Sequence, residues 1–367
     1  MPGAEAAGPT EVVELREHGH ERVVGGLVGY VVELLAANDE PFLTPDVAEA
    51  AVRPASSLKF MKLEGIHHIT AITGDAQRNV DFYADLLGLR LVKKTVNQDD
   101  PTVYHLFYAD DKGSAGTDLT FFEYPGASPG RPGDGMVHAI VWRVASDVAL
   151  GFWEERLGGR GVEATRDDGS LRFADPEGLD HELVADPTGD EPLIAEHPEV
   201  PAELALRGFH AVRAYSSRPK ASHELLESAL GFTPAEGAWE VRGDKRGGFY
   251  GYDAPPDQQG VQSAGSVHHV AWASTMEDHE KWRQRVIDAG GRPTPVIDRF
   301  YFRSIYFREP SGVLFEIATL GPGFATDEDR EQLGERLSLP PDYEHLREEV
   351  ERRLTPLENP RDRWARR

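Results

Sequence analysis

The hydrophobic and polar positions of this chain repeat four times in the same order. Each repeat opens with a short apolar strand, continues with a capped amphipathic helix that ends at a glycine, and closes with further strands. The opening strands all carry a histidine among apolar residues, in Ile66-His67-His68-Ile69, Val137-His138-Ala139-Ile140, Phe209-His210-Ala211-Val212 and Val267-His268-His269-Val270. An order that recurs in this way is typical of an internal repeat. The pattern predicts an α+β protein built from four βαβββ modules.

The modules also predict how the chain is divided. We place them at residues 65–125, 136–185, 206–253 and 267–320. We expect Asp75, Ser146 and Ser274 to cap the helices of the first, second and fourth modules. A segment rich in proline and acidic residues, Asp186 to Glu203, separates a first half (61–190) from a second half (204–320). We expect the modules to pair two by two into two open mixed β-sheet barrels.

Both ends of the chain lie outside the repeat. Residues 1–60 contain no copy of it and are predicted to be an extension of unknown role, with one helix from Glu21 to Asn38. Met61 directly precedes the first strand and resembles a natural chain start, so we expect the extension to be dispensable. Residues 321–367 form a polar tail with helical spacing over Asp327–Leu337 and Tyr343–Leu354. This tail packs either across the sheets or on a neighbouring subunit.

Composition excludes several classes of function. The chain has no cysteine, which excludes disulfides, thiolate nucleophiles and cysteine-based metal sites, so any metal must be held by histidine and carboxylate. The net charge of −24 disfavours a nucleic-acid or membrane partner. The N-terminus lacks the basic region of a secretory signal, and we predict a cytoplasmic protein. The acidity fits either a salt-rich cytosol or an ordinary acidic protein.

The histidines of the repeat differ in how often they occur. The first histidine is present in all four copies, whereas the second is present only as His68 and His269. Neighbouring side chains on a strand point to opposite faces, so we expect the two members of a pair to face different sides. A residue shared by all copies favours a structural role, and one restricted to two copies favours a function performed once. His68 and His269 are therefore the predicted metal ligands.

A carboxylate completes the predicted site. Two modules end with a carboxylate at the same distance from a turn motif. In the fourth module the motif Glu309-Pro310-Ser311-Gly312 precedes Glu316, and in the second module Asp175-Pro176-Glu177-Gly178 precedes Glu182 with the same spacing. Glu316 lies in an otherwise apolar strand, where an ionised carboxylate is costly unless a cation meets it.

The second module has Ala139 in place of a ligand, so its site is predicted to be inactive. Two imidazoles and one carboxylate leave open positions, as suits non-haem Fe(II) that binds an organic substrate and O₂. The opposing interpretation is a set of satisfied core histidines and a surface glutamate.

The segment before Glu316 alternates cationic and aromatic residues, including Arg299, Tyr301, Arg303 and Tyr306. These side chains either form the solvated face of a sheet or, if they lie near a metal, orient a phenolic oxygen.

These motifs resemble ring-cleaving dioxygenases of the vicinal oxygen chelate (glyoxalase) superfamily. The resemblance is to the hydroquinone branch, similar to 2,6-dichlorohydroquinone 1,2-dioxygenase, and covers about residues 61–355. It rests on Gly65-Ile66-His67-His68-Ile69-Thr70, Asp81-Phe82-Tyr83 with Leu87-Gly88-Leu89, Val267-His268-His269-Val270, and Pro310-Ser311-Gly312 through Glu316. It implies the vicinal oxygen chelate fold and a role in aromatic compound catabolism.

The resemblance further implies an extradiol-type enzyme that inserts both atoms of O₂ into a hydroquinone-type diol. Its metal would be Fe(II), with Mn(II) as the alternative, on His68, His269 and Glu316. The resemblance also implies roles beside the metal or at the substrate for His67, Thr70, His268, Arg299 and Tyr306. Among these, His268 or Tyr306 would transfer protons, and Arg299 would stabilise oxyanion charge. Catechol-cleaving relatives take a ligand from the third repeat, where this chain has Ala211, so catechol is disfavoured. A homo-oligomer is compatible with this reading.

Two other functions fit the same sequence. A glyoxalase-like isomerase or lyase would use Zn, Ni or Mn on the same fold, and four ligands would favour it where three are present here. A binding module of the superfamily would lack a metal set, and His68, His269 and Glu316 argue against it.

Overall fold

The computed structural model describes residues 61–167, 169–186 and 188–364. The extension 1–60, with its predicted helix from Glu21 to Asn38, lies outside the described residues.

Four βαβββ modules follow one another along the chain, as predicted. The first contains β1 (Ile66–Thr73), α2 (Ala76–Val80), η1 (Asp81–Leu86), β2 (Arg90–Asn97), β3 (Asp100–Ala109) and β4 (Asp118–Glu123). The second contains β5 (Val137–Val144), α3 (Asp147–Gly159), β6 (Ala164–Asp167), β7 (Ser170–Ala174) and β8 (Asp180–Ala185). The third contains β9 (Phe209–Tyr215), η2 (Pro219–Ser222), η3 (Glu224–Ala229), β10 (Thr233–Ala235), β11 (Ala238–Arg242) and β12 (Gly247–Asp253). The fourth contains β13 (Val267–Ser274), α4 (His279–Asp288), β14 (Ile297–Asp298), β15 (Arg303–Arg308) and β16 (Leu314–Thr319).

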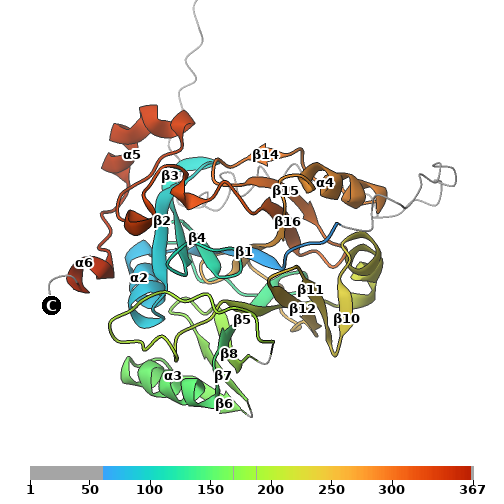
Figure 1. Ribbon diagram of the computed structural model, residues 1–367, viewed down its shortest axis with the longest axis horizontal. Coiled ribbons are helices and arrows are strands. Elements are labelled where there is room, and N and C mark those ends of the chain that lie inside the picture. Colours follow the sequence, from blue (N-terminus) through green and yellow to red (C-terminus); the bar gives the residue numbers. More distant parts are fainter. Residues whose placement is uncertain (1–60, 168, 187, 365–367) are drawn as a thin grey trace, which may run out of the picture.

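The modules pair into two eight-stranded mixed sheets, which confirms the predicted fold class. One sheet has the order β14-β15-β16-β13-β1-β4-β3-β2 and the other β10-β11-β12-β9-β5-β8-β7-β6. The first therefore joins the first and fourth modules, and the second joins the two middle modules (Figure 1). The sheets do not follow the consecutive halves 61–190 and 204–320, since each half contributes one module to each sheet. As a division into folding units, those halves stay a prediction.

Local signals explain where the helices begin and end. The Asp75 carboxylate caps α2 by accepting a hydrogen bond from the Arg78 amide at 3.0 Å, and the Ser146 hydroxyl caps α3. Gly88 and Gly231 follow the first and third helices with φ of 73° and 74°, a left-handed conformation that favours glycine. The prediction that Ser274 caps the fourth helix was wrong. That helix begins at His279, and the Ser274 hydroxyl contacts the His279 imidazole instead, at 3.0 Å.

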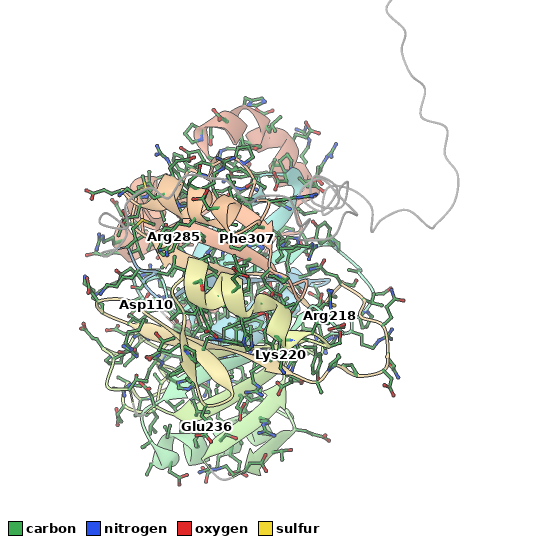
Figure 2. All side chains as sticks on the ribbon, turned by 90° about the vertical axis from the view of Figure 1, so that its right-hand side faces the viewer. Asp110, Arg218, Lys220, Glu236, Arg285 and Phe307 are labelled. Atoms are coloured by element: carbon green, nitrogen blue, oxygen red, sulfur yellow. The ribbon has the colours of Figure 1, made fainter. Side chains whose placement is uncertain are left out.

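Helices from different modules meet on the outside of the sheets. In Figure 2, η3 lies beside α4, and the labelled Arg285 comes from the latter. Its guanidinium donates to the Ser228 carbonyl at 3.2 Å. The contact joins the third module to the fourth, and so links the two sheets.

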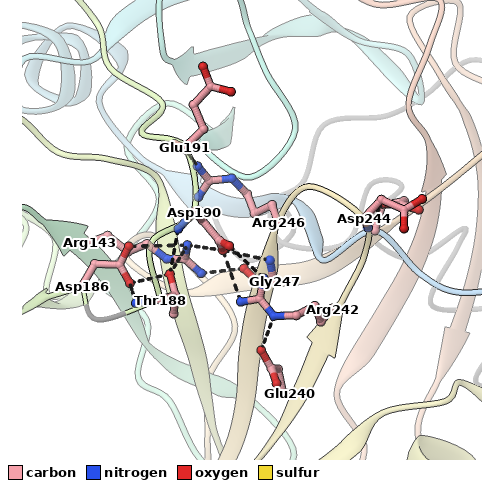
Figure 3. A network of polar contacts seen from close by, with 11 residues as sticks. Arg143, Asp186, Thr188, Asp190, Glu191, Glu240, Arg242, Asp244, Arg246 and Gly247 are labelled. Atoms are coloured by element: carbon pink, nitrogen blue, oxygen red, sulfur yellow. Dashed lines mark hydrogen bonds and ion pairs between the residues drawn. The ribbon is translucent and has the colours of Figure 1, made fainter.

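The segment between the middle modules is held by buried charge. Arg143 of β5 has no exposed surface and donates to Asp190 at 2.6 Å and to the Gly247 carbonyl at 2.6 Å. Arg242 of β11 donates to the same Asp190 at 2.8 Å, so one carboxylate joins strands from two modules (Figure 3). The predicted linker is therefore part of the packed structure rather than a free connection.

The C-terminal tail packs across the first sheet of the same chain. It contains η4 (Phe324–Thr326), η5 (Arg330–Gln332), η6 (Pro341–Leu346), α5 (Arg347–Arg353) and α6 (Pro360–Trp364). In Figure 1 it runs along the β2 and β3 side and ends with α6 beside α2. The Tyr343 hydroxyl donates to the Gln98 carbonyl at 2.7 Å, and Lys93 of β2 pairs with Asp327 and Glu328. The helix predicted for Asp327–Leu337 is only the short turn η5, whereas the one predicted for Tyr343–Leu354 is formed by η6 and α5.

Among the described residues, no helix has the length and apolar character needed to cross a membrane.

Replacing Lys93 by methionine should destabilise the protein by about 3 kcal/mol, because the buried Glu328 would keep only the more distant and exposed Arg336, at 3.8 Å, as a counter-charge. Urea unfolding followed by far-UV circular dichroism measures this. Lys281→Met is the matched control, since its pair with Asp278 is solvent-exposed and should change the free energy of unfolding by less than about 1 kcal/mol. Equal effects of the two substitutions would contradict the assigned role of Lys93.

Candidate metal centre

Three predicted ligands meet on neighbouring strands of the first sheet. His68 lies on β1, His269 on β13 and Glu316 on β16, and these strands are adjacent. The Nε2 atoms of the two histidines are 3.3 Å apart, and they lie 3.1 Å and 2.9 Å from Glu316 Oε2. All three side chains are buried. The sequence prediction thus selected three residues that the fold brings to one point, although 248 positions separate the first from the last.

A β-bulge explains how the paired histidines can act together. The β1 and β13 registers shift between Ile66 and His68, and again at His268, so the first histidine of each pair has no partner across the ladder. The expectation that the two members of a pair face opposite sides was wrong, because a bulge interrupts strict alternation. His138 and His210 occupy the same kind of shift between β5 and β9. The histidine common to all four repeats therefore marks the bulge.

The first histidine of each pair orients the second. His67 Nε2 lies 3.1 Å from the Thr319 carbonyl, which can only accept, so the hydrogen is on Nε2. His67 Nδ1 is then an acceptor, and it lies 2.9 Å from Nδ1 of His68. His68 must therefore donate through Nδ1, which leaves its Nε2 lone pair facing Glu316. Burial and the neighbouring His68 lower the pKa of His67 to about 3, which keeps it neutral. His268 Nδ1 stands 2.7 Å from Nδ1 of His269 in the same relation.

The chemistry of Glu316 fits a cation at this point. Its carboxylate has no exposed surface, and neither oxygen accepts a hydrogen bond of good geometry, although two imidazole nitrogens lie within 3.1 Å. Such nitrogens approach with lone pairs rather than hydrogens. Burial opposes ionisation, whereas a protonated His68 or His269 would hold the pKa of Glu316 well below its usual range, and a metal ion would supply the same positive charge. An ionised, buried carboxylate without donors is costly, and a divalent metal would remove that cost. Donor separations near 3 Å match two histidines and one carboxylate on one face of a metal ion.

A cavity opens beside the ligand set, and two of the three ligands line it. His68, His269, Thr70, Arg299 and Tyr306 line it. Phenylalanine side chains form much of the remaining wall, from Phe107, Phe122 and Phe302. The predicted residues His67 and His268 do not line this cavity and instead contact the two ligand imidazoles from behind. The site thus combines a metal-ligand set with an apolar, aromatic chamber.

Arg299 is fixed at the cavity wall by a bidentate ion pair. Its Nη1 and Nη2 donate to the two oxygens of Asp99 at 3.0 Å and 2.9 Å. Burial opposes its charge, but Tyr306 and Asp99 raise the pKa of Arg299, so the guanidinium stays charged. Tyr306 stands opposite Glu316 in the β15–β16 register, and burial together with that carboxylate raises the pKa of the phenol. Of the alternating residues before Glu316, Arg299, Tyr301 and Tyr306 are accordingly cavity groups, whereas Arg303 is exposed to solvent.

Sequence reasoning missed three polar residues near the centre. Asp99 and His105 line the cavity, but neither belongs to a repeated motif. Asp118 is buried, and one oxygen of its carboxylate lies within 4.8 Å of nitrogens of His67 and His68. Burial raises the pKa of Asp118 to about 8. Asp118 lies at the start of β4 and directly opposite His68 in the strand register. That position could have identified it, but the register between β1 and β4 cannot be read from the sequence.

The second sheet has no corresponding centre among its described residues. Ala139 and Ala211 occupy the ligand positions on β5 and β9, and Glu182 on β8 pairs with Arg172 at 3.2 Å. His138 is stacked on Tyr215 with a ring separation of 3.9 Å and contacts Asp253 at 2.8 Å. This sheet keeps the bulges, while His138 and Glu182 have polar partners within the sheet.

The model of the Glyoxalase/Bleomycin resistance protein/Dioxygenase superfamily matches the chain twice, over residues 65–189 and 135–317. The chain belongs to this superfamily. Among curated members it is 39% identical over 328 residues to "Putative ring-cleaving dioxygenase MhqA" of Bacillus subtilis, covering 81% of this chain and 100% of that protein. It is 32% identical over 313 residues to chlorohydroquinone/hydroquinone 1,2-dioxygenase of Sphingobium indicum, covering 80% and 96%.

A solved structure agrees with this membership. The crystal structure of a putative dioxygenase from Bacillus subtilis is 41% identical in sequence and superposes with a TM-score of 0.76, covering 82% of this chain and 99% of that one. The family resemblance inferred from the motifs is thereby confirmed. Residues 1–60 are absent from the region matched by the superfamily model.

Replacing Glu316 by glutamine should remove bound metal, because the amide supplies no negative charge to the two imidazoles. Metal analysis after gel filtration of protein loaded with Fe(II) under nitrogen measures this. Glu182→Gln, the matching position of the second sheet, should leave the metal content unchanged. Full metal retention in Glu316→Gln would exclude this centre.

Replacing His67 by phenylalanine should weaken metal affinity by about 10-fold to 100-fold, since His68 would lose the acceptor that fixes its Nδ1 hydrogen. Competition with a chromogenic chelator gives the affinity. His138→Phe, at the equivalent bulge in the second sheet, is the control and should retain the stacking on Tyr215. Identical affinities in both variants would show that His67 does not orient the ligand.

Proposed function

We propose that this protein is an Fe(II)-dependent dioxygenase that opens the ring of a hydroquinone-type diol with both atoms of O₂. The observation that carries the proposal is the cluster of His68, His269 and Glu316, whose two histidines line an aromatic cavity. The superfamily relatives add support, since one is named as an enzyme that acts on hydroquinone and chlorohydroquinone. Mn(II) is the alternative metal for the same ligands.

Iron held by His68, His269 and Glu316 would supply adjacent open positions for a phenolic oxygen and O₂. A ligand set with a single carboxylate leaves net positive charge on a divalent ion. That charge favours binding of the phenol as its anion.

The chain's own residues would position the substrate ring. Phe107, Phe122 and Phe302 present apolar surface to it and exclude water from the cavity. Arg299 is rigidly paired with Asp99, so its positive charge is available at a fixed place where oxyanion charge develops. Tyr306 keeps its hydrogen because of its raised pKa and can donate to an oxygen beside Glu316.

His67 and His268 would serve the reaction indirectly. Each lies behind a ligand imidazole, outside the cavity, and fixes which nitrogen faces the metal. The proton-transfer role implied for His268 by family resemblance therefore falls more naturally to Tyr306, which lines the cavity.

Oxygen uptake by the Fe(II)-loaded protein tests the proposal. Hydroquinone, methylhydroquinone and chlorohydroquinone should each consume one O₂ per molecule and give a ring-opened acid, whereas catechol should react much more slowly. Absence of uptake with all three, together with turnover of a methylglyoxal–thiol adduct, would favour the glyoxalase-like isomerase. Mass spectrometry after reaction under ¹⁸O₂ checks that both oxygen atoms enter the product.

A further inference from the structure

Several polar side chains of the cavity have hydrogen-bond partners within the protein. Arg299 is paired with Asp99, the Gln98 amide donates to the Arg299 carbonyl at 2.8 Å, and Asn97 accepts from the Asp99 amide at 3.0 Å. His105 of β3 differs, because only one of its two ring nitrogens has a hydrogen-bond partner among the described residues. It is half-buried, and its accessible part faces the cavity.

The hydrogen-bond chain next to His105 fixes its tautomer. Thr120 donates its hydroxyl hydrogen to Thr70 Oγ1 at 2.9 Å. A hydroxyl has a single hydrogen, so Thr120 can only accept in its 2.9 Å contact with His105 Nε2. His105 therefore carries hydrogen on Nε2. Burial and the nearby His68 and His269 hold the pKa of His105 well below its ordinary value, so the ring is neutral. Its Nδ1 is consequently a hydrogen-bond acceptor that no described residue uses.

Aromatic neighbours hold this acceptor in place. The His105 ring lies 4.0 Å from the ring of Phe107 and 4.4 Å from that of Phe122, measured between centroids. Both phenylalanines line the cavity, so the imidazole is part of the wall that surrounds a bound ring. An acceptor fixed in this way costs little conformational entropy when it binds a donor.

His105 stands across the cavity from the metal ligands. The strand order β13-β1-β4-β3 places it two strands from β1, about 10 Å away across the sheet. The strand registers place it opposite Phe122 and Ile72, four residues along from His68. A ring with one oxygen beside His68 and His269 extends from the ligands into the cavity. A second hydroxyl reaches the far side only if it is para to the first, whereas an ortho hydroxyl stays beside the ligands.

We propose that His105 Nδ1 accepts the hydrogen bond of the second, non-coordinating hydroxyl of a 1,4-diol and so selects para diols. This rests on the proposed function and specifies its substrate class. A site built to receive a donor discriminates against an analogue that lacks it, because the buried acceptor would remain unpaired. The same feature disfavours catechol, independently of the absent ligand in the third repeat.

Two substitutions test the two ring nitrogens of His105 individually. The amide of glutamine reaches the place of Nε2, so His105→Gln can keep the contact to Thr120 while it removes the acceptor at Nδ1. The amide of asparagine lies at the place of Nδ1, so His105→Asn keeps the acceptor and loses the contact to Thr120. Metal content and thermal unfolding verify that both variants are folded and loaded.

The measurement is anaerobic binding of hydroquinone and of 4-fluorophenol to the full-length, Fe(II)-loaded protein. Fluorine leaves the coordinating hydroxyl in place but donates no hydrogen. The wild-type protein should bind hydroquinone about 10-fold more tightly than 4-fluorophenol. His105→Gln should reduce this ratio to about 2-fold or less, mainly by weakening hydroquinone, and His105→Asn should keep most of it. In turnover the loss should appear in KM more than in kcat, since the hydrogen bond is present before and during the reaction.

Equal discrimination in the wild type and in His105→Gln, or none in the wild type, would overturn the role of His105. In either case, O₂ uptake with hydroquinone by the wild type would leave the proposed function standing. A wild-type protein that neither binds nor oxidises hydroquinone would refute both.

Discussion

The charge of Glu316 is the constraint on which the architecture of the first sheet depends. An ionised carboxylate with no exposed surface and no hydrogen-bond donor is unfavourable in an apolar strand, and the fold meets it with two imidazole nitrogens at 2.9 Å and 3.1 Å. Those nitrogens offer lone pairs, so the three groups are mutually stabilising only around a cation. This arrangement is held by the bulges on β1 and β13, by the hydrogen bonds between neighbouring histidines, and by the position of β16. Binding free energy of a metal would then appear directly as folding stability.

Repetition in the sequence made much of this predictable. The βαβββ order follows from hydrophobic patterning and from caps such as Asp75, and the ligand set follows from comparing the second histidine of each repeat. Pairing of the first module with the fourth did not follow, because hydrophobic patterns along strands contain no information about which module lies beside which. It was nevertheless implicit in the ligand choice, since His68 and Glu316 can share an ion only if their modules are adjacent.

The errors have a common physical origin in departures from regular geometry. Strict alternation fails at His67 and His268 because the ladder carries an extra residue there, and a bulge has no clear sequence signature. Ser274 has the residue type of a cap, but its hydroxyl serves His279 instead. Asp99 and His105 could not be found from repeats because they are specific to one module, and single polar residues on strands are ordinarily solvated. The middle modules show the complementary case, in which the repeat is kept and the ligands are replaced by Ala139 and Ala211.

The nested order of the modules bears on how the polypeptide emerges from the ribosome. The two middle modules pair with each other and can close as soon as both have been made, whereas β1 must wait for β13, some two hundred residues later. Until then the first module presents an unpaired strand edge, a known route to aggregation during synthesis. Tyr343 contacts the turn that carries Asp99, so the wall of the cavity is complete only after nearly the whole chain has been translated. A product terminated before Tyr343 would therefore form the sheet of the two middle modules but lack the complete wall of the cavity.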